Sequence, residues 1–319
     1  MKFFHGIVRT VCVAAVAGFL PLAAVASPLA TESQAAVPYN VQQLIVVDYQ
    51  EMENSNIAMQ LRNKVLPPEL KRLQDALQNS GMDVGQSIDQ LAFASFMAPN
   101  SNITQIVGIG SGQFPTTDIL ANFKKKKVKG IQVRNVTVYP MGGTGLDVAF
   151  LDQTTMLFGS LQSVKASLDA RDGIVPSFLS NTDMQNLIPP VQTVAVWSIM
   201  NAKGTQTMMH NVMGEASSVA DYDTVKKQLL GSRYSMDFEH GVQFNLEVMT
   251  PDTISAATMS SLLSAAALYK KMGATQSEKT AIDDTNITSS GGILQVLFSA
   301  SDNDFATLLN SNLFQSVIH

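Results

Sequence analysis

The alternation of hydrophobic and polar positions predicts strands and amphipathic helices in succession along the first half of the chain. Gln43 to Tyr49 is a β-branched, apolar run of strand length, and Ile57, Leu61 and Val65 follow it at helical spacing. Pro67-Pro68 interrupts this helix, and a second helix with Leu70, Leu73 and Leu77 is predicted from there to Gly81. The pattern further predicts strands at 88–97, 103–109, 133–139, 146–152 and 155–159, a helix at 118–127, and a helix containing Val164 and Leu168 that ends near Gly173.

The second half shows a similar succession. Val194 to Met200 is an apolar strand run, residues 205–230 are predicted to be mostly helical, and residues 232–239 and 242–249 predict a hairpin across His240-Gly241. The elements predicted after that are a helix at 255–272, a segment at 281–287, a turn at 289–292, a strand at 293–300 and a last helix from Asp302. The residues expected to form the buried apolar face of the 255–272 helix are Ile254, Ala257, Leu262, Ala265, Tyr269 and Met272.

Both halves therefore contain strands, helices and hairpins in the same order, which predicts an internal duplication. The fold class expected is α+β, with two similar halves of mostly antiparallel sheet, helices packed on one face of each, and a pseudo-twofold axis between them. The predicted division is a signal peptide at 1–26, a flexible leader at 27–37, one α+β repeat at 38–175, a linker at 176–190 and a second α+β repeat at 191–319.

The N-terminal residues have the pattern of a secretory signal peptide. Lys2 and Arg9 form a basic region, residues 11–20 form an apolar run, and Ala24-Val25-Ala26 is a small-x-small cleavage pattern. We expect export through the secretory route to the periplasm or the extracellular space, with cleavage between Ala26 and Ser27. The apolar run is shorter than the roughly twenty residues that a spanning helix needs, so no retained anchor is expected.

Composition narrows the classes of function further. Cys12 is the only cysteine and lies within the predicted signal, so the mature chain would have no disulfide, thiolate metal ligand or cysteine nucleophile. The 319 residues include 21 basic and 26 acidic side chains, and removal of Lys2 and Arg9 leaves 19 basic against 26 acidic, a formal charge near −7. This balance gives no electrostatic reason to bind nucleic acid or anionic lipid.

Several positions of the first half resemble an uncharacterised group of exported bacterial proteins over about residues 40 to 200. The matching positions are Gly81-x-Asp83 before Ile88-Asp89, Gly112-x-Phe114 before a helix, Val136-x-Val138-Tyr139, Ala149-x-x-Asp152, Phe158-Gly159, Val164, Leu168-Asp169 and Gly173. The resemblance implies an α+β architecture and an envelope location, and it transfers no catalytic residue.

Glycines and lysines form two candidate binding motifs. Gly108-x-Gly110-x-Gly112 follows a predicted strand, but a dinucleotide fingerprint would need glycine at position 113, which is Gln113, so a glycine-relaxed strand is the favoured interpretation over a phosphate loop. The cluster at 124–127 with Lys129 is interpreted as a solvated helix C-terminus, with a docking patch as the alternative.

Met208, Met209, His210 and Met213 are the candidate metal ligands, because thioether and imidazole groups at helical spacing suit Cu(I). Methionine also commonly fills irregular cores, and core packing is the favoured interpretation, with an adaptable apolar groove as the next. No metal or other cofactor is therefore predicted.

Acidic pairs and sequons add little chemistry. The acidic pairs are Asp221-x-Asp223, Asp283-Asp284 and Asp302-x-Asp304, and none has the regular spacing of a calcium loop. Asp252 and Asp302 are expected to cap helix N-termini. Glycosylation sequons begin at Asn102, Asn135 and Asn286.

No hydrolase motif is present, and only His210, His240 and His319 follow the predicted signal. The function expected is a non-catalytic, soluble binding or interaction module of the cell envelope, with a small apolar ligand or an envelope protein as partner. Two alternatives stay open: a hydrolase whose Ser/His/Asp site is assembled only in space, with His210 or His240 as base, and a purely structural envelope component.

Overall fold

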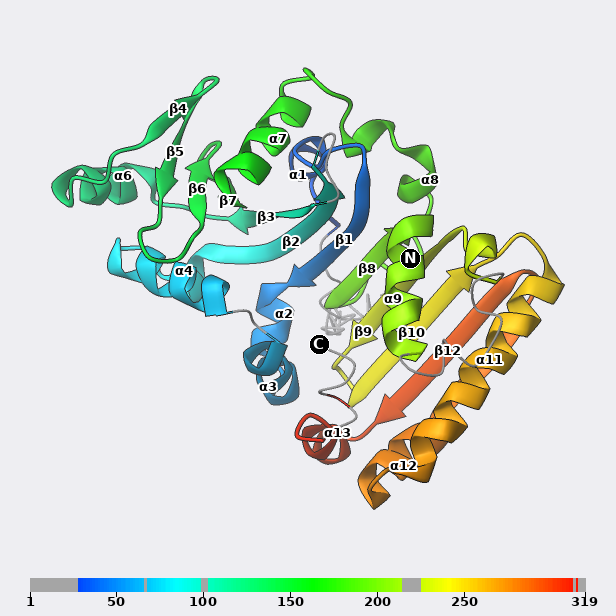
Figure 1. Ribbon diagram of the computed structural model, residues 1–319. Helices are drawn as coiled ribbons and strands as arrows, with labels where there is room; N and C mark the ends of the chain where they lie inside the picture. The colour runs from blue at the N-terminus through cyan, green and yellow to red at the C-terminus, as the bar shows by residue number, and fades with distance from the viewer. Residues whose placement is uncertain (1–27, 66–67, 99–102, 214–224, 312–313, 315–319) are drawn as a thin grey trace, which may run out of the picture.

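The computed structural model describes residues 28–65, 68–98, 103–213, 225–311 and 314 (Figure 1). The predicted cleavage site at Ala26 and Ser27 lies outside the described residues, as do Asn102, His319 and the 221–223 acidic pair. Among the helices that are described, none has both the length and the apolarity needed to cross a membrane.

Twelve described strands form one sheet in the order β11-β12-β10-β9-β8-β1-β2-β3-β7-β6-β5-β4, and neighbouring strands are antiparallel throughout. This confirms the predicted α+β class with an antiparallel sheet. The strands are β1 (Val41–Asp48), β2 (Ile88–Met97), β3 (Thr104–Gly112), β4 (Ile131–Val133), β5 (Val136–Pro140), β6 (Asp147–Phe150), β7 (Thr155–Gly159), β8 (Val196–Asn201), β9 (Gly231–Asp237), β10 (Val242–Met249), β11 (Thr285–Ser290) and β12 (Ile293–Ala300).

The helices of the first half are α1 (Thr31–Ala35), α2 (Tyr49–Glu53), α3 (Asn56–Val65), α4 (Pro68–Asn79), α5 (Val84–Ser87), α6 (Thr116–Lys125) and α7 (Leu161–Arg171). Those that follow are η1 (Phe178–Ser180), α8 (Thr182–Gln185), α9 (Ala202–Met213), η3 (Lys226–Gln228), α11 (Thr253–Met272), α12 (Gln276–Asp283) and α13 (Asp302–Leu308).

The two halves meet at the centre of the sheet, where β1 and β8 pair with Leu44 opposite Ile199. Counted outward from this pair, the strand order is β1-β2-β3-β7-β6 in the first half and β8-β9-β10-β12-β11 in the second. The first half has two further strands, β5 and β4, beyond β6. The strand order is therefore the same on both sides, although the halves share one continuous sheet. A duplication of one ancestral unit stays a prediction.

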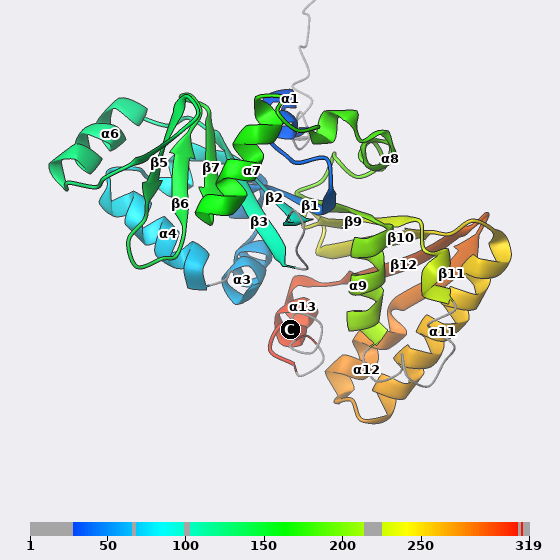
Figure 2. The same ribbon diagram turned by 45° about the horizontal axis from the view of Figure 1, so that its top comes forward.

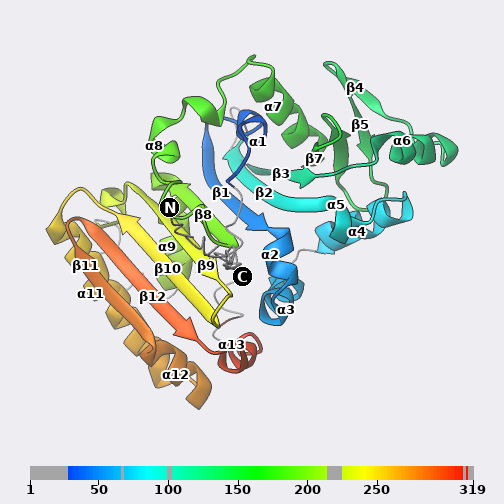
Figure 3. The same ribbon diagram turned by 180° about the vertical axis from the view of Figure 1, so that it is seen from behind.

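Helices cover both faces of the sheet in the first half, whereas in the second half α9 and α11 cover one face and α8 covers the other face only at β8. On β7, Met156 and Phe158 pack with α4 and α6, whereas Leu157 between them packs with α7 on the opposite face. Figure 2 shows α4 and α7 on opposite sides of this part of the sheet. Successive side chains of a strand point to opposite faces, so both faces of β7 are buried. In the second half, α9 and α11 lie on one face, and the other face is turned toward the viewer in Figure 3. Arg233 and Glu247 form a 2.5 Å ion pair on that open face.

Two predicted segments of irregular chain carry packed structure. The predicted leader contains α1, and Ala36 and Val37 beside it are fully buried. The predicted linker contains η1 and α8, whose Phe178 and Met184 are buried in the same core cluster. Apolar residues in both segments cover the face of the sheet on which α7 lies, and this cover extends to Trp197 and Ile199 of β8 in the second half.

The strand predicted at 133–139 is wrong in one respect, because the structure has a hairpin there. β4 and β5 pair with Val133 opposite Val136, which leaves Arg134 and Asn135 as a two-residue loop. Arg134 adopts a φ of 54°, a conformation that a non-glycine residue rarely takes, and its side chain forms a 2.6 Å ion pair with Asp169 of α7.

The start of the segment predicted at 281–287 is also different, since residues 281–283 belong to α12. Thr275 and Glu278 form a capping box, in which the Thr275 amide donates to the Glu278 carboxylate at 2.7 Å. This cap satisfies amides of the first turn and begins a helix that continues to Asp283. Likewise, Ser301 rather than the predicted Asp302 caps α13, and it accepts from the Asp304 amide at 3.2 Å.

The apolar face predicted for α11 is not the buried one. The structure buries Ala256, Met259, Leu263 and Ala266 of this helix. It leaves the predicted face largely exposed, with Ile254 79% and Met272 82% accessible. The reason lies in the composition of α11, which has no charged residue before Lys270 and offers apolar side chains on every side.

Candidate functional site

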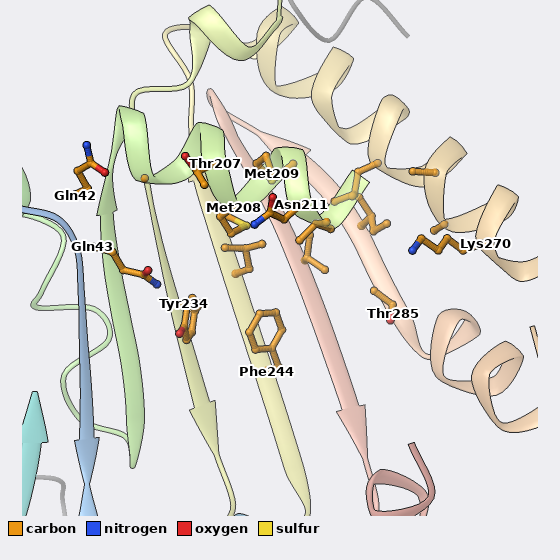
Figure 4. A pocket seen from close by; sticks show the side chains of 18 of the residues that line it. Gln42, Gln43, Thr207, Met208, Met209, Asn211, Tyr234, Phe244, Lys270 and Thr285 are labelled. Carbon is orange, nitrogen blue, oxygen red and sulfur yellow. The ribbon is translucent and has the colours of Figure 1, made fainter. Parts of the chain in front are cut away.

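A cavity of about 750 Å³ lies mostly in the second half, between α9, α11 and the sheet, and its lining extends to Ser95, Thr104 and Ile106 on β2 and β3. Its walls are mostly apolar, and Figure 4 shows the side chains that converge on it from the two helices and from the strands beneath. The apolar lining residues include Met208, Met209, Val212, Phe244, Leu246, Leu263, Ala266, Ala267, Ile282, Ile287 and Val296. This size falls in the usual range of small-molecule sites, about 300–1,000 Å³.

The first turn of α9 is held tightly on the sheet. Asn201 caps it by accepting from the Gly204 amide at 2.9 Å, and the hydroxyls of Thr205 and Ser232 are 2.8 Å apart in a buried hydrogen bond. Gly204 permits this approach, because a Cβ there would lie 2.3 Å from the carbonyl oxygen of Gln42 on β1. The helix therefore starts in close contact with the central strands.

On the other side of the cavity, α11 packs on β11 and β12 and begins with Asp252 as its N-cap, as predicted from the sequence. Asp252 accepts from the Ser255 amide at 2.8 Å, and this hydrogen bond lowers the pKa of the Asp252 carboxyl. Where α11 faces the cavity it presents Leu263, Ala266, Ala267 and Lys270, two of which are alanines. Alanine favours the helix but fills little space, so the sheet between α9 and α11 remains partly uncovered.

A hydrogen-bonded polar group lies in the cavity wall near the centre of the sheet. The Gln43 amide donates to the hydroxyl of the fully buried Ser198 at 3.3 Å, and Tyr234 is hydrogen-bonded to the same hydroxyl. Burial raises the pKa of Tyr234, and the hydrogen bond with Ser198 opposes that rise. The Tyr234 and Phe244 rings, 5.8 Å apart between centroids, continue the wall toward α11.

Further along, the cavity wall carries the one positive charge among its described lining residues. Lys270 extends from the last turn of α11, and its amino nitrogen points toward the space between the helices (Figure 4). Thr285 at the start of β11 lies beside it and donates its hydroxyl proton to the Ala281 carbonyl at 2.8 Å. The next residue, Lys271, leaves the cavity and forms an ion pair with Asp283.

The structure separates the candidate metal ligands. Met209 and Met213 are buried in the core cluster under α9, and Met208 lines the cavity with part of its side chain. His210 is exposed on the same helix. The methionines therefore pack with apolar neighbours while the imidazole lies on the outer surface.

Glycines 108, 110 and 112 all belong to β3. A Cβ at Gly108 would lie 2.1 Å from the Phe158 ring, and one at Gly110 would lie 2.9 Å from Met156. These glycines thus make room for large side chains of the neighbouring strand β7. The observation supports the interpretation as a relaxed strand and leaves no open loop for a phosphate.

The remaining candidates are exposed. Residues 124–127 lie at the C-terminal end of α6, where Lys126 donates to the Asn79 carbonyl at 2.7 Å. His240 lies in the turn between β9 and β10 with its Nδ1 3.9 Å from the Glu239 carboxylate. Asn135 and Asn286 are exposed, and Asp284 is the C-terminal cap of α12.

Sequence reasoning found the methionines of α9 but missed Tyr234, Phe244 and Lys270. These three residues lie on different elements, and their spacing along the chain carries no motif. The available signal was α11 itself, which combines uncharged residues over 253–269 with alanines at 265–267 and a lysine pair at its end.

Comparison with known proteins adds a distant structural likeness. No protein-family model and no curated protein matches the chain. Crystal form I of TP0453 aligns with a TM-score of 0.48 at 12% identity and covers 93% of this chain and 100% of that one. Crystal form III of the same protein aligns with a TM-score of 0.46 at 10% identity, covering 89% and 97%. The chain is therefore similar in outline to TP0453, and no role is inferred from that likeness.

Proposed function

We propose that this protein is a non-catalytic binding module of the cell envelope, exported by its N-terminal signal, and that it holds a small apolar ligand between α9 and α11. One observation carries the proposal: the cavity of about 750 Å³ is walled mainly by apolar side chains from two helices and the sheet. Apolar ligands gain free energy when they leave water for such a site, at about 25 cal/mol per Å² of buried surface.

Polar groups interrupt the mostly apolar wall, and polar groups in an apolar site commonly fix the orientation of a ligand. Gln43, Ser198 and Tyr234 form one such group, and Asn211, Lys270 and Thr285 lie further along the wall. His210 and His240 are both exposed, and neither is among the described residues that line the cavity.

The test uses Nile red, an uncharged apolar dye whose fluorescence rises in apolar surroundings. Ala267→Leu adds a side chain inside the cavity, and Ala265→Leu adds the same side chain at an exposed position of α11 two residues away. We expect saturable dye binding to the purified native chain, a loss of at least tenfold in affinity for Ala267→Leu, and little change for Ala265→Leu. Equal affinities for the native chain and Ala267→Leu, or no binding to the native chain, would refute the proposal.

A further inference from the structure

We infer that the outer face of α11 is an interface for a second copy of this chain, and that two α11 helices pack against each other in antiparallel orientation about a twofold axis. The inference does not depend on the cavity, because the residues of this face lie outside its described lining. Its basis is the size, composition and symmetry of an exposed, uncharged stripe along α11.

The stripe lies on the side of α11 opposite its packed side. The helix packs on β11, β12 and α12, and Met259 and Leu263 on its inner side belong to the core cluster of the second half. Figure 2 shows α11 in the part of the second half that is distant from the first half. Its exposed positions recur every three or four residues, which places them on one helix face. They are Ile254, Ala257, Thr258, Ser261, Ala265, Leu268, Tyr269 and Met272.

This stripe contains five of the six residues that the sequence pattern assigned to a buried face of the helix, namely Ile254, Ala257, Ala265, Tyr269 and Met272. An apolar stripe at helical spacing is the usual sign of a face that packs against another element. In one copy of the chain the stripe is exposed. Burial between two copies would account for the pattern.

The exposed apolar area is large for a monomer. Four large side chains of the stripe, Ile254, Leu268, Tyr269 and Met272, are between 58% and 82% accessible. At about 150–250 Å² for a large side chain, they expose roughly 550 Å² together. Monomeric proteins rarely expose contiguous apolar patches of more than a few hundred Å². Two copies joined through the stripe would bury about 1,100 Å², which reaches the lower limit of about 1,000 Å² for a specific interface.

The order of side-chain sizes fits an antiparallel pair of identical helices. A twofold axis at the level of Leu263 places opposite each other the residues that are equally far from it on the two helices. Two of the resulting pairs combine a large with a small side chain, and the pair at the crossing is small on both sides, so the helices can approach closely. A parallel pair would instead place each large side chain against itself. Across the two copies, the antiparallel pairs are Ile254 with Met272, Ala257 with Tyr269, Thr258 with Leu268, and Ser261 with Ala265.

The absence of charge also favours a second copy as the partner. A charged surface would lose its hydration on this stripe without gaining a counter-charge, which is costly. The stripe itself is an uncharged surface, so a second copy meets the requirement. An anionic lipid surface fits less well, because helices that lie on one carry basic residues along their polar side, and α11 has no charged residue before Lys270.

An interface of this limited area forms a weak dimer, and we expect a dissociation constant of about 10 μM. The chain is then monomeric in dye-binding and unfolding assays at about 0.5 μM. Ala265→Leu therefore remains a control for the cavity in those assays, although Ala265 lies in the interface.

Sedimentation equilibrium of the native chain from about 1 to 200 μM tests the inference. Leu268→Lys and Thr258→Glu each introduce one charge into the stripe. A chain with both substitutions would place each new carboxylate opposite the new ammonium group of the other copy. The two positions are about 15 Å apart along one helix, so the new charges cannot pair within one copy.

Ile174→Lys is the control, because Ile174 is also an exposed apolar residue, 52% accessible, but lies in the first half. Thermal unfolding of each variant verifies that it is folded. We expect the native chain and Ile174→Lys to dimerise equally, each single substitution in α11 to weaken the dimer at least tenfold, and the double substitution to recover most of that loss.

A native chain that stays monomeric up to about 200 μM would refute the inference, and binding of that monomer to phosphatidylcholine vesicles would identify a lipid surface as the partner instead. Dimerisation that survives both single substitutions would exclude α11 from the interface. Failure of the double substitution to recover any of the loss would refute the antiparallel pairing.

Discussion

Replacement of Gly108 by alanine should destabilise the fold strongly, although the substitution adds one methyl group. Gly108 on β3 lies in register between Phe93 on β2 and Phe158 on β7, and the two rings pack edge to face with centroids 5.8 Å apart. The added Cβ would lie 2.1 Å from the Phe158 ring, whereas ordinary contacts are 3.4–4 Å. The ring would have to move by about 1.3 Å or more within a core where it is 4% exposed.

Overpacking of this kind costs about 1–3 kcal/mol, and the size of the overlap places Gly108→Ala near the upper end. Alanine recovers about 0.5–1 kcal/mol through the lower backbone entropy of the unfolded chain, so the net loss expected is about 2 kcal/mol in urea unfolding. Gly142→Ala is the control, because nothing lies within 4 Å of its Cβ position, and its stability should change little or rise slightly.

A double-mutant cycle separates this clash from other effects. In a Phe158→Leu background the shorter side chain leaves room for the methyl group, so Gly108→Ala should cost about 1–2 kcal/mol less there than in the native chain. A neutral effect of Gly108→Ala in the native background, or the same cost in both backgrounds, would show that Gly108 is not kept small by Phe158. The glycine motif would then need another explanation, such as a ligand loop.

Three further outcomes are expected. Burial raises the pKa of Asp152, but hydrogen bonds from the Thr154 amide and hydroxyl and from the Thr155 amide outweigh burial and hold the pKa below the ordinary 3.8. Asp152→Asn should therefore be less stable than the native chain in urea unfolding near neutral pH. The difference in stability should fade as the pH falls below about 3.8, because the native carboxylate is then protonated. Met259→Ala should lower the free energy of unfolding by about 2–5 kcal/mol, because Met259 is fully buried. Ile254→Ala, at a position that is 79% exposed, should change it by no more than about 0.5 kcal/mol. Equal losses for the two variants would contradict the burial assigned to α11. Mass spectrometry of the exported product should give an N-terminus at Ser27, and a product that retains Met1 would contradict the predicted signal.

The sequence predicted the strands well because alternation is a local signal. β2 and β3 alternate or run apolar over their length, and a turn separates them. The β4–β5 hairpin was missed because its loop is Arg134-Asn135, which lacks the glycine usual in a two-residue turn and contacts the distant Asp169. That contact cannot be read from neighbouring positions.

The buried face of α11 could not be predicted for a different reason. A helix that is apolar on every side has no single periodic stripe, so the pattern cannot decide which face packs. The predicted stripe through Ile254 and Met272 is exposed, and the buried one runs through Met259 and Leu263. The cavity could not be predicted either, because its walls join α9, α11 and strands that lie between β11 and β3 in the sheet and come together only in the folded chain.

The two halves use the same strand order but fill the space over the sheet differently. In the first half, α6 and α4 cover β7 through large side chains that include Phe123, Leu77 and Phe158. In the second half, the corresponding space over β10 and β12 faces alanines of α11 and remains hollow. The difference lies in side-chain size rather than topology, which is the arrangement expected if one half supports the fold and the other keeps room for a ligand.

This contrast makes a last prediction about Ala267→Leu. If the hollow space serves binding, filling it should raise the free energy of unfolding of the empty protein by about 0.5–2 kcal/mol while it weakens Nile red binding, because cavity filling stabilises folds and function commonly opposes it. Ala265→Leu, which points away from the cavity, should change neither quantity appreciably. A loss of stability on Ala267→Leu would mean that the walls are already in contact there, and that the second half is packed as closely as the first.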